Sequence, residues 1–380
     1  MRHHIGKDEN FKILPIEFNN NTDKSLLAYC LGAVLYMPAN KDISNKIINK
    51  ELEGLTTITM CFEDAIDENS LEEAENNVIK TLNTLLKNIK DKNFLINDMP
   101  LFFLRVRNLN QFISFTQKLE PNHLKLITGF VFPKFNICNA NGYFNHLNKL
   151  NKSYKQKLYG MPILETEEIM YKESRISNLV KLKEIVDKYK KLVLNIRVGG
   201  TDFSSLYGIR RGIDYTIYDV NVVRDCLTDI LNIFNRNEDG YVISAPVWEY
   251  FSNENRLLKP QLREHPFNIA KKLYKRQEII NESIDGLFRE VILDRANGFV
   301  GKTIIHPSHI KYVNALQCVS EEEYMDAMQI LSNRTEGVEK SFSNNKMNEI
   351  KPHTSWAKKI LLRAKAYGVV KDGKQIELFI

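Results

Sequence analysis

Several features that define other classes of protein are missing from this sequence of 380 residues. Its five cysteines are scattered and form no CxxC pair, which argues against a zinc site or a disulfide framework and fits free thiols. No apolar run reaches about 18 residues, so we expect no transmembrane helix. Residues 1–25 lack the apolar core of a signal peptide. We therefore expect a soluble, cytoplasmic protein that does not bind membranes.

A strong excess of charge of one sign is missing as well. The chain has 53 basic and 47 acidic residues, and its net charge of +6 is not gathered in one basic block. Nucleic acid is therefore a poor candidate partner. Hydrophobic residues make up 43% of the chain, which is enough for a sizeable core. The length suits one large domain or two ordinary ones.

Strand-like and helix-like patterns alternate along the chain. Helical patterns separate most of the apolar runs, and the one at 70–90 opens with an apparent capping box, Ser70 with Glu73. The eight short β-prone runs are 33–39, 56–64, 100–107, 128–134, 161–166, 192–202, 241–248 and 302–307. Such alternation predicts parallel strands with right-handed crossovers. Eight units of this kind predict an α/β fold, a (β/α)₈ TIM barrel.

An open, doubly wound sheet is the alternative fold. It would need a glycine-rich phosphate loop after an early strand. The first run ends instead in Met37-Pro38-Ala39-Asn40, which has no GxGxxG pattern. The barrel is therefore the favoured fold.

We divide the chain into three parts. Residues 1–29 are a polar lead-in with His3 and His4 in a free tail, 30–330 form the barrel, and 331–380 form a linker and a C-terminal helical extension. Residues 334–352 are polar and are predicted to be the linker. The pattern of 354–368 predicts an amphipathic helix that ends at Gly368.

The connection before the last strand is unusually long. Residues 249–282 exceed a typical loop and are predicted to form a helical insertion. The seventh strand delivers the chain to the mouth of the barrel, so we expect this insertion to cover part of the mouth.

Charged residues follow almost every predicted strand. The carboxyl ends of barrel strands meet at one face, where active sites lie. Glu165 and Asp202 end adjacent strands and could share one Mg²⁺. The planar fork of Arg105 could hold a carboxylate or an enolate oxygen. Ion pairs among Arg105, Glu63 and Asp64 would account for these residues equally well without any function.

Ordered along the chain, these segments resemble the citrate lyase beta-subunit group of the HpcH/HpaI aldolase superfamily. Residues 35–40, LYMPAN, resemble the first-strand Phe-Val-Pro-Gly-Asn of that family. The most specific piece is the Gly-Phe-x-Gly-Lys-x-x-Ile-His-Pro ending at 298–307. The other matching segments are CFEDAI, LRVRN, VFPKF, ILETEEIM and VGGTDFSSLYG.

The resemblance implies a TIM barrel that makes or breaks carbon–carbon bonds with Mg²⁺, for which Mn²⁺ could substitute. It implies a small organic acid or an acyl-CoA as substrate, and a homo-oligomer, trimer or hexamer. The implied metal ligands are Glu165 and Asp202, and the implied catalytic residues are Arg105, Glu63 and Asp64. The substrate-binding candidates are Arg105, Lys134, Gly199, Gly200, Thr201 and Arg210, the last with Arg211 beside it.

This chain departs from the family pattern in several places. Cys61 stands where the family usually has Asp, and Arg107 where it has Asn. Two alternatives therefore remain beside a lyase that uses a CoA thioester. One is a 2-oxoacid aldolase that needs no CoA, and the other is a non-catalytic protein that kept the barrel and its metal pocket.

Overall fold

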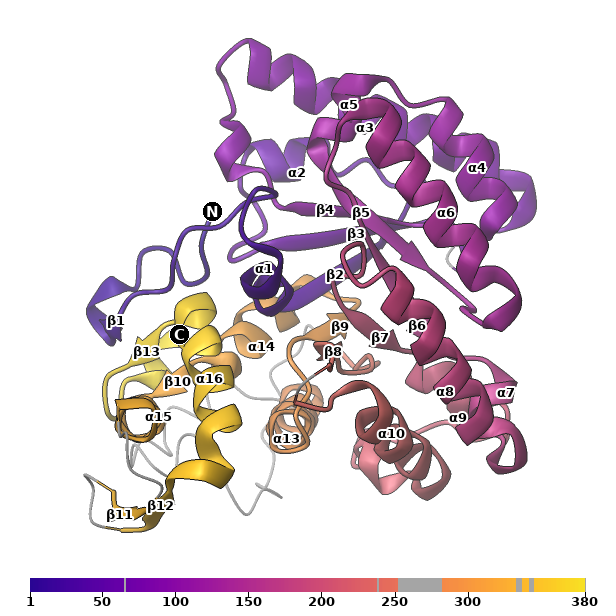
Figure 1. Cartoon of the computed structure of the whole chain (residues 1–380). Helices are drawn as coiled ribbons and strands as arrows, with labels where there is room; N and C mark the ends of the chain where they lie inside the picture. Colours follow the sequence, from indigo (N-terminus) through magenta and orange to yellow (C-terminus); the bar gives the residue numbers. More distant parts are fainter. Residues whose placement is uncertain (65, 238, 252–281, 333–336, 342–344, 380) are drawn as a thin grey trace.

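Eight parallel strands form the centre of the molecule (Figure 1). The computed structural model describes the chain apart from residues 65, 238, 252–281, 333–336, 342–344 and 380. The strands follow one another in the order β8-β7-β6-β5-β4-β3-β2-β9. Their bounds are β2 Ala33–Pro38, β3 Thr57–Cys61, β4 Leu101–Arg105, β5 Ile127–Phe132, β6 Tyr159–Leu164, β7 Ile196–Val198, β8 Ile243–Ser244 and β9 Lys302–Ile304.

The two edges of this sheet meet and close the barrel. A parallel bridge joins Ala245, just after β8, to Lys302 of β9. The backbone N–H of Ala245 donates to the carbonyl of Gly301 at 3.1 Å. The predicted TIM barrel is confirmed, and each of the eight β-prone runs overlaps one of its strands, although β5 and β6 begin one and two residues before their runs.

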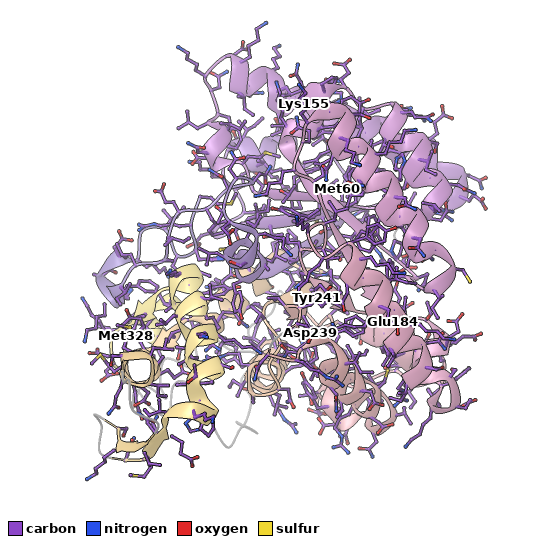
Figure 2. The ribbon with its side chains drawn as sticks, viewed as in Figure 1. Met60, Lys155, Glu184, Asp239, Tyr241 and Met328 are labelled. Carbon is purple, nitrogen blue, oxygen red and sulfur yellow. The ribbon has the colours of Figure 1, made fainter. Side chains whose placement is uncertain are left out.

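Alternate residues of the strands face opposite sides. On β4, Phe102 and Leu104 pack in the larger apolar cluster beneath the outer helices, whereas Leu101 and Phe103 pack in the second cluster. Strands buried on both faces are typical of parallel sheets covered by helices. Met60 of β3 lies at the centre of the molecule, while Lys155 and Glu184 lie at its outside (Figure 2).

Helices surround the strands (Figure 1). Those of the barrel are α2 Ser44–Ile48, α3 Leu71–Lys90, α4 Leu109–Gln117, α5 Pro121–Leu126, α6 Ile137–Tyr154, α7 Glu167–Met170, α8 Lys172–Lys188, α9 Gly200–Ser205, α10 Asn221–Phe234, α13 Glu282–Ala296 and α14 Ile310–Gln317. The prediction of a capping box for α3 is wrong, because the side chain of Ser70 makes no capping hydrogen bond. Asp67 accepts instead from the backbone N–H groups of Asn69 and Ser70 in the preceding 3-10 turn.

The two ends of the chain pack together beside the barrel (Figure 1). Strand β1 (Phe11–Ile13) pairs antiparallel with β13 (Val369–Val370), which pairs parallel with β10 (Val319–Ser320). The remaining elements here are α1 Lys24–Cys30, α15 Glu321–Ser332, the antiparallel pair β11 Val338–Lys340 and β12 Met347–Glu349, and α16 Ile350–Tyr367. The pair β11–β12 lies within the segment expected to be a linker.

Two smaller expectations have clear outcomes. The C-terminal helix ends at Gly368 as expected, where φ is 81°, a value that glycine adopts readily. The prediction that His3 and His4 lie in a free tail is wrong. His3 is fully buried, and its ring stacks on that of Tyr367 with the centroids 4.6 Å apart. The expected lid falls mainly on residues 252–281, which lie outside the described residues.

Candidate active site at the mouth of the barrel

The predicted site residues gather at the carboxyl ends of five consecutive strands, β3 to β7. Arg105 is the last residue of β4 and pairs in register with Cys61, the last residue of β3. Glu63 and Asp64 follow β3, Lys134 follows β5, and Glu165 follows β6 directly. Asp202 lies in the first turn of α9, after β7.

Arg105 is the centre of a group of carboxylates. Its guanidinium Nη2 lies 2.5 Å from Glu63 Oε2 and 3.3 Å from Glu165 Oε1, while Nη1 lies 3.1 Å from Asp64 Oδ2. Arg105 and Glu165 are almost fully buried, whereas the Asp64 side chain is 61% exposed. The ion pairs of Arg105 with Glu63 and Asp64 are therefore present, and Glu165 joins them from the far side.

Lys134 connects Glu165 to the fourth acid, Asp202. Its backbone N–H donates to Glu165 Oε1 at 2.8 Å, and its ammonium contacts Asp202 Oδ1. The same ammonium lies 3.9 Å from Glu165 Oε1. One oxygen of each carboxylate is thus engaged by Lys134.

The second oxygen of each carboxylate faces Gly199. A Cβ atom placed on Gly199 would lie 2.5 Å from Glu165 Oε2 and 3.0 Å from Asp202 Oδ2. The two carboxylates therefore converge on one point, and only glycine leaves room for them. Gly200 is tightly packed for another reason, since its Cβ would lie 2.9 Å from Pro246.

Burial and neighbouring charges perturb the acids in different directions. Burial raises the pKa of Glu165 to about 8, although Arg105 partly offsets the effect. Burial likewise raises the pKa of Glu63 to about 7 against the opposing influence of Arg105. For Asp64, the charge of Arg105 and a hydrogen bond with Glu63 outweigh burial and lower the pKa. Perturbed groups of this kind gather at functional sites.

The remaining predicted residues lie apart from this cluster. Thr201 and Arg210 are exposed, and Arg210 lies in the loop after α9. Arg211 is buried, pairs with Glu290 and lies over the Trp248 ring, with 4.8 Å between Cζ and the centroid. It therefore stabilises the junction between that loop and α13.

Arg107 binds the backbone of the turn that carries two of the site residues. Its Nη1 donates to the carbonyl of Ile66 at 2.8 Å and to that of Phe62 at 3.5 Å. It thereby holds the turn that carries Glu63 and Asp64. The side chain of Cys61 is buried, and its Sγ lies 3.9 Å from Arg105 Nη1.

One residue of this region was not singled out from the sequence. Arg197 of β7 is almost fully buried, and its guanidinium reaches Thr303 of β9 and the ring of Tyr36 of β2. A side chain that touches strands across the barrel lies in its interior. The signal was available, because Arg197 is the one charged residue in the apolar run 192–198.

The donor set fits a divalent cation of the magnesium type. Mg²⁺ is usually bound through one or two carboxylates, with water and substrate oxygens completing the octahedron. Glu165 Oε2 and Asp202 Oδ2 face the same point. Among the described residues, no three His, Cys, Asp or Glu side chains form a metal-binding group, so the protein would contribute only these two carboxylates.

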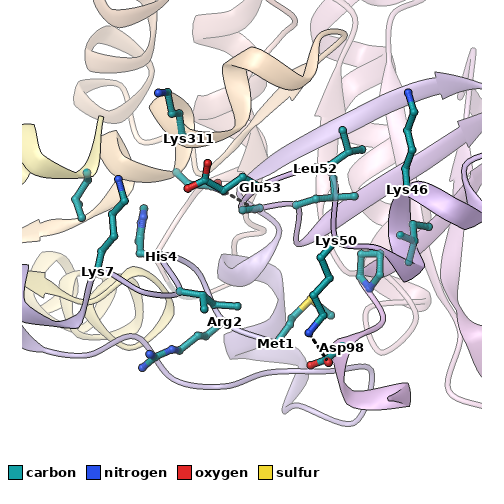
Figure 3. A pocket seen from close by; sticks show the side chains of 17 residues that line it. Met1, Arg2, His4, Lys7, Lys46, Lys50, Leu52, Glu53, Asp98 and Lys311 are labelled. Atoms are coloured by element: carbon teal, nitrogen blue, oxygen red, sulfur yellow. Dashed lines mark hydrogen bonds and ion pairs between the residues drawn. The ribbon is translucent and has the colours of Figure 1, made fainter. Parts of the chain in front are cut away.

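A separate cavity of about 270 Å³ lies at the opposite end of the barrel (Figure 3). Residues 52–55, Asp98 and Pro100 are among those that line it, and they precede β3 and β4 rather than follow them. Its charges are mixed, and Lys50 pairs with Asp98 at 2.8 Å. The cavity is therefore distinct from the cluster around Arg105.

The family match makes this barrel a carbon–carbon lyase of the TIM-barrel class. The model of the family described as "C-C_Bond_Lyase of the TIM-Barrel fold" matches residues 25–369, and the chain belongs to that family. This membership makes the protein an enzyme and sets aside the non-catalytic alternative. No curated protein matches the chain by sequence.

Solved structures of similar fold come from the citrate lyase and malate synthase groups. CitE from Mycobacterium tuberculosis, in complex with magnesium, acetoacetate and coenzyme A, has a TM-score of 0.50 and 16% identity, over 89% of this chain and 99% of its own. The M. tuberculosis citrate lyase beta subunit with oxaloacetate and magnesium has a TM-score of 0.43 and 15% sequence identity. The match covers 76% of this chain and 96% of that one. Haloferax volcanii malate synthase with magnesium and glyoxylate has a TM-score of 0.48 and 11% sequence identity. The match covers 73% of this chain and 72% of that one. At these identities the likeness concerns the fold alone.

The described residues include no helix that is both long and apolar enough to cross a membrane.

Proposed function

We propose that this lyase depends on Mg²⁺ and cleaves or forms a carbon–carbon bond next to the carboxylate of a hydroxy or oxo acid. The observation that carries the proposal is the convergence of Glu165 Oε2 and Asp202 Oδ2 beside the Arg105 guanidinium. Two oxygen ligands and one fixed cation suit an organic acid that is chelated on one side and stabilised on the other.

Each residue of the cluster has a definite task in this proposal. A bound Mg²⁺, or Mn²⁺ in its place, supplies Lewis-acid chemistry that polarises the hydroxyl or carbonyl oxygen of the substrate. Glu165 and Asp202 hold the ion. Arg105 places its guanidinium where the negative charge of the enolate fragment develops, and such preorganised donors contribute most in a buried site. Lys134 supplies a second cation at the rim, on a side chain that is 44% exposed.

Glu63 is the candidate for proton transfer. Its pKa of about 7 lets it accept and return a proton near neutral pH, as a general acid–base group requires. Its Oε2 lies 2.5 Å from Arg105, so it stands beside the oxygen that Arg105 would stabilise. Asp64, whose pKa is lowered, stays ionised and compensates the charge of Arg105.

The substrate class follows from the charges at the mouth. A small organic acid suits the buried cations, and an acyl-CoA remains the candidate for the second reactant because of the family's chemistry. Thr201 in α9 and Arg210 in the loop after it are both exposed, and we propose that they contact the part of the substrate outside the barrel. A homo-oligomer stays a prediction.

Calorimetry with Mg²⁺ and Mn²⁺ tests the metal assignment. Wild-type protein should bind one ion, while Glu165→Gln and Asp202→Asn should each lose binding by at least about tenfold, since each removes one of two protein ligands. Glu184→Gln removes an exposed carboxylate on α8 and is the matched control. Unchanged binding in both site variants would overturn the proposal.

Activity requires a second assay. Cleavage and condensation should be measured over a set of 2-oxo acids, hydroxy acids and acyl-CoA thioesters, with Mg²⁺ and with a chelator. We expect turnover only with the metal, and its loss in Asp202→Asn together with the loss of metal binding. Equal turnover with the chelator would show that the reaction does not need the ion.

A further inference from the structure

The cavity at the amino-terminal end of the barrel is built from segments that are far apart in the sequence (Figure 3). Its volume of about 270 Å³ is close to the lower end of the range for small-molecule sites, roughly 300–1,000 Å³. Its lining residues come from the segments 2–7, 46–55 and 311–314, together with Asp98, Pro100 and Leu378. The cavity therefore has room for a small ligand at a distance from the cluster around Arg105.

Positive charge is in excess around this cavity. Two of the cations that line it are already paired, since Lys50 lies 2.8 Å from Asp98 and Arg2 lies 2.5 Å from Asp8. Three lysines remain, and Glu53 is the one lining carboxylate left to balance them. The full set of charged lining side chains is Arg2, Lys7, Lys46, Lys50 and Lys311 against Glu53 and Asp98.

Two of these lysines, Lys7 and Lys311, lie on the same side of the cavity (Figure 3). The pKa of Lys311 is lowered, first by burial and then by the charge of Lys7, so the two ammonium groups repel each other. Glu53 opposes this effect, but its side chain is exposed. Lys7 donates to a backbone carbonyl at 3.2 Å, and Lys311 lies over the Tyr312 ring, 5.2 Å from its centroid. Neither lysine forms an ion pair in the described part of the chain, and neighbouring ammonium groups of this kind attract an anion.

The wall beside these lysines is uncharged and largely apolar. Leu52, Leu55 and Leu378 contribute to it. Ile5 lines the cavity as well, with 69% of its surface exposed, so a ligand that covered it would remove apolar surface from water. Burial lowers the pKa of His4 to about 4, so its ring is neutral at pH 7 and adds no charge. The lining thus suits a molecule that has an anionic end and an apolar body.

We propose that this cavity binds an organic phosphate monoester, with its phosphate group at Lys7 and Lys311 and its organic group against Leu52 and Leu55. A phosphate monoester carries between one and a half and two negative charges at pH 7, which matches two unpaired ammonium groups. Lysine binds phosphate as a point charge and needs no planar fork for it. A single carboxylate would neutralise only one of the two lysines.

Phenyl phosphate, inorganic phosphate and benzoate are the matched probes for this site. Phenyl phosphate has the double charge and an apolar ring, inorganic phosphate lacks the ring, and benzoate has the ring with a single charge. Calorimetry should be done on the full chain at about 0.15 M salt, where weak binding to exposed charges is screened. We expect phenyl phosphate to bind at least about fivefold more tightly than either of the other two.

Two substitutions with opposite expected effects locate the binding. Lys311→Met removes one ammonium group at similar side-chain volume and should weaken phenyl phosphate at least about fivefold. Glu53→Gln removes the opposing carboxylate and should tighten phenyl phosphate by about twofold or more, a gain that a folding defect does not produce. Lys152→Met is the matched control, because Lys152 is exposed in the last turn of α6 and does not line the cavity.

The outcomes separate the parts of this inference. Unchanged affinity in both Lys311→Met and Glu53→Gln overturns the site, since phenyl phosphate would then bind elsewhere. Benzoate that binds as tightly as phenyl phosphate overturns the choice of a phosphate, and inorganic phosphate that does so overturns the apolar part. Absence of binding by all three probes overturns the whole inference. None of these results bears on Mg²⁺ binding at Glu165 and Asp202, which lie at the other end of the barrel.

Discussion

The backbone N–H of Lys134 donates a hydrogen bond of 2.8 Å to Glu165 Oε1, so the end of β5 positions the carboxylate that follows β6. Lys134 takes part with its side chain as well, since its ammonium contacts Asp202. To make both contacts the residue adopts a φ of 46°, in the left-handed region that residues other than glycine rarely occupy. The backbone is therefore strained at the position that makes both contacts.

A comparison of Lys134→Gly with Lys134→Ala should reveal that strain. Both variants lose the ammonium and keep the backbone N–H, but only alanine retains the Cβ that disfavours a positive φ. We expect Lys134→Gly to be more stable than Lys134→Ala by about 1 kcal/mol in urea unfolding. Equal stabilities, or a more stable alanine variant, would show that the left-handed conformation costs nothing here.

Metal-free protein should become less stable as the pH rises from about 5 to about 8. The native Glu165 has a pKa of about 8, above its ordinary value of 4.5, so the native state binds the proton more tightly than the unfolded chain between these values. The free energy of unfolding therefore falls as the pH rises through this window. Glu63, whose pKa is raised to about 7, lowers it in the same direction up to about pH 7.

The expected slope from Glu165 is about 1 kcal/mol per pH unit. Glu165→Gln cannot titrate, and its urea unfolding should depend less on pH. Mg²⁺ binding requires the ionised carboxylate, so its affinity should rise over the same window. Stability that increases with pH in the metal-free protein would contradict the assignment.

Removal of the Arg105 side chain should be strongly destabilising. Arg105→Leu leaves Glu63, Asp64 and Glu165 together without their shared cation. Loss of one partner of a buried ion pair typically costs about 3–5 kcal/mol. Mg²⁺ should recover part of this loss, because it can neutralise Glu165. Arg105→Lys keeps the positive charge but lacks the planar guanidinium. Its unfolding temperature should lie between those of the wild type and Arg105→Leu. The comparison should be made above about pH 8, where Glu63 and Glu165 are ionised. A neutral effect of Arg105→Leu there would mean that solvent, and not Arg105, compensates these acids.

The fold was predictable because its signals are local and repeated. Each barrel strand overlaps a short β-prone run such as 100–107, and parallel strands joined by helices permit few topologies. The chain ends were harder to predict. Residues 11–13 and 369–370 pair across almost the whole length of the chain, and two such short strands have no distinctive pattern of their own.

The gathering of the charged residues was predictable for the same topological reason, since parallel strands end at one face. Their individual contacts were not. The sequence does not reveal that Arg107 turns back to the carbonyl groups of residues 62 and 66, or that Arg211 is buried against Glu290 while Arg210 is exposed. These differences depend on tertiary packing, which adjacent arginines in a loop do not specify.

Gly199→Ala should disable the metal site without any change of charge. The φ of Gly199 is −93°, which alanine adopts without strain, so the backbone tolerates the substitution. The new Cβ would lie 2.5 Å from both Cβ and Oε2 of Glu165 and 3.0 Å from Asp202 Oδ2, and must displace the Glu165 side chain from its position beside Asp202. We expect at least about a tenfold loss of Mg²⁺ affinity, since ligands must stay within a narrow range of positions for this ion.

Gly337→Ala is the matched control, because its Cβ would meet no atom within 4 Å. Calorimetry on both variants decides the matter: if Gly199→Ala binds Mg²⁺ as tightly as Gly337→Ala, the ion does not lie between Glu165 and Asp202.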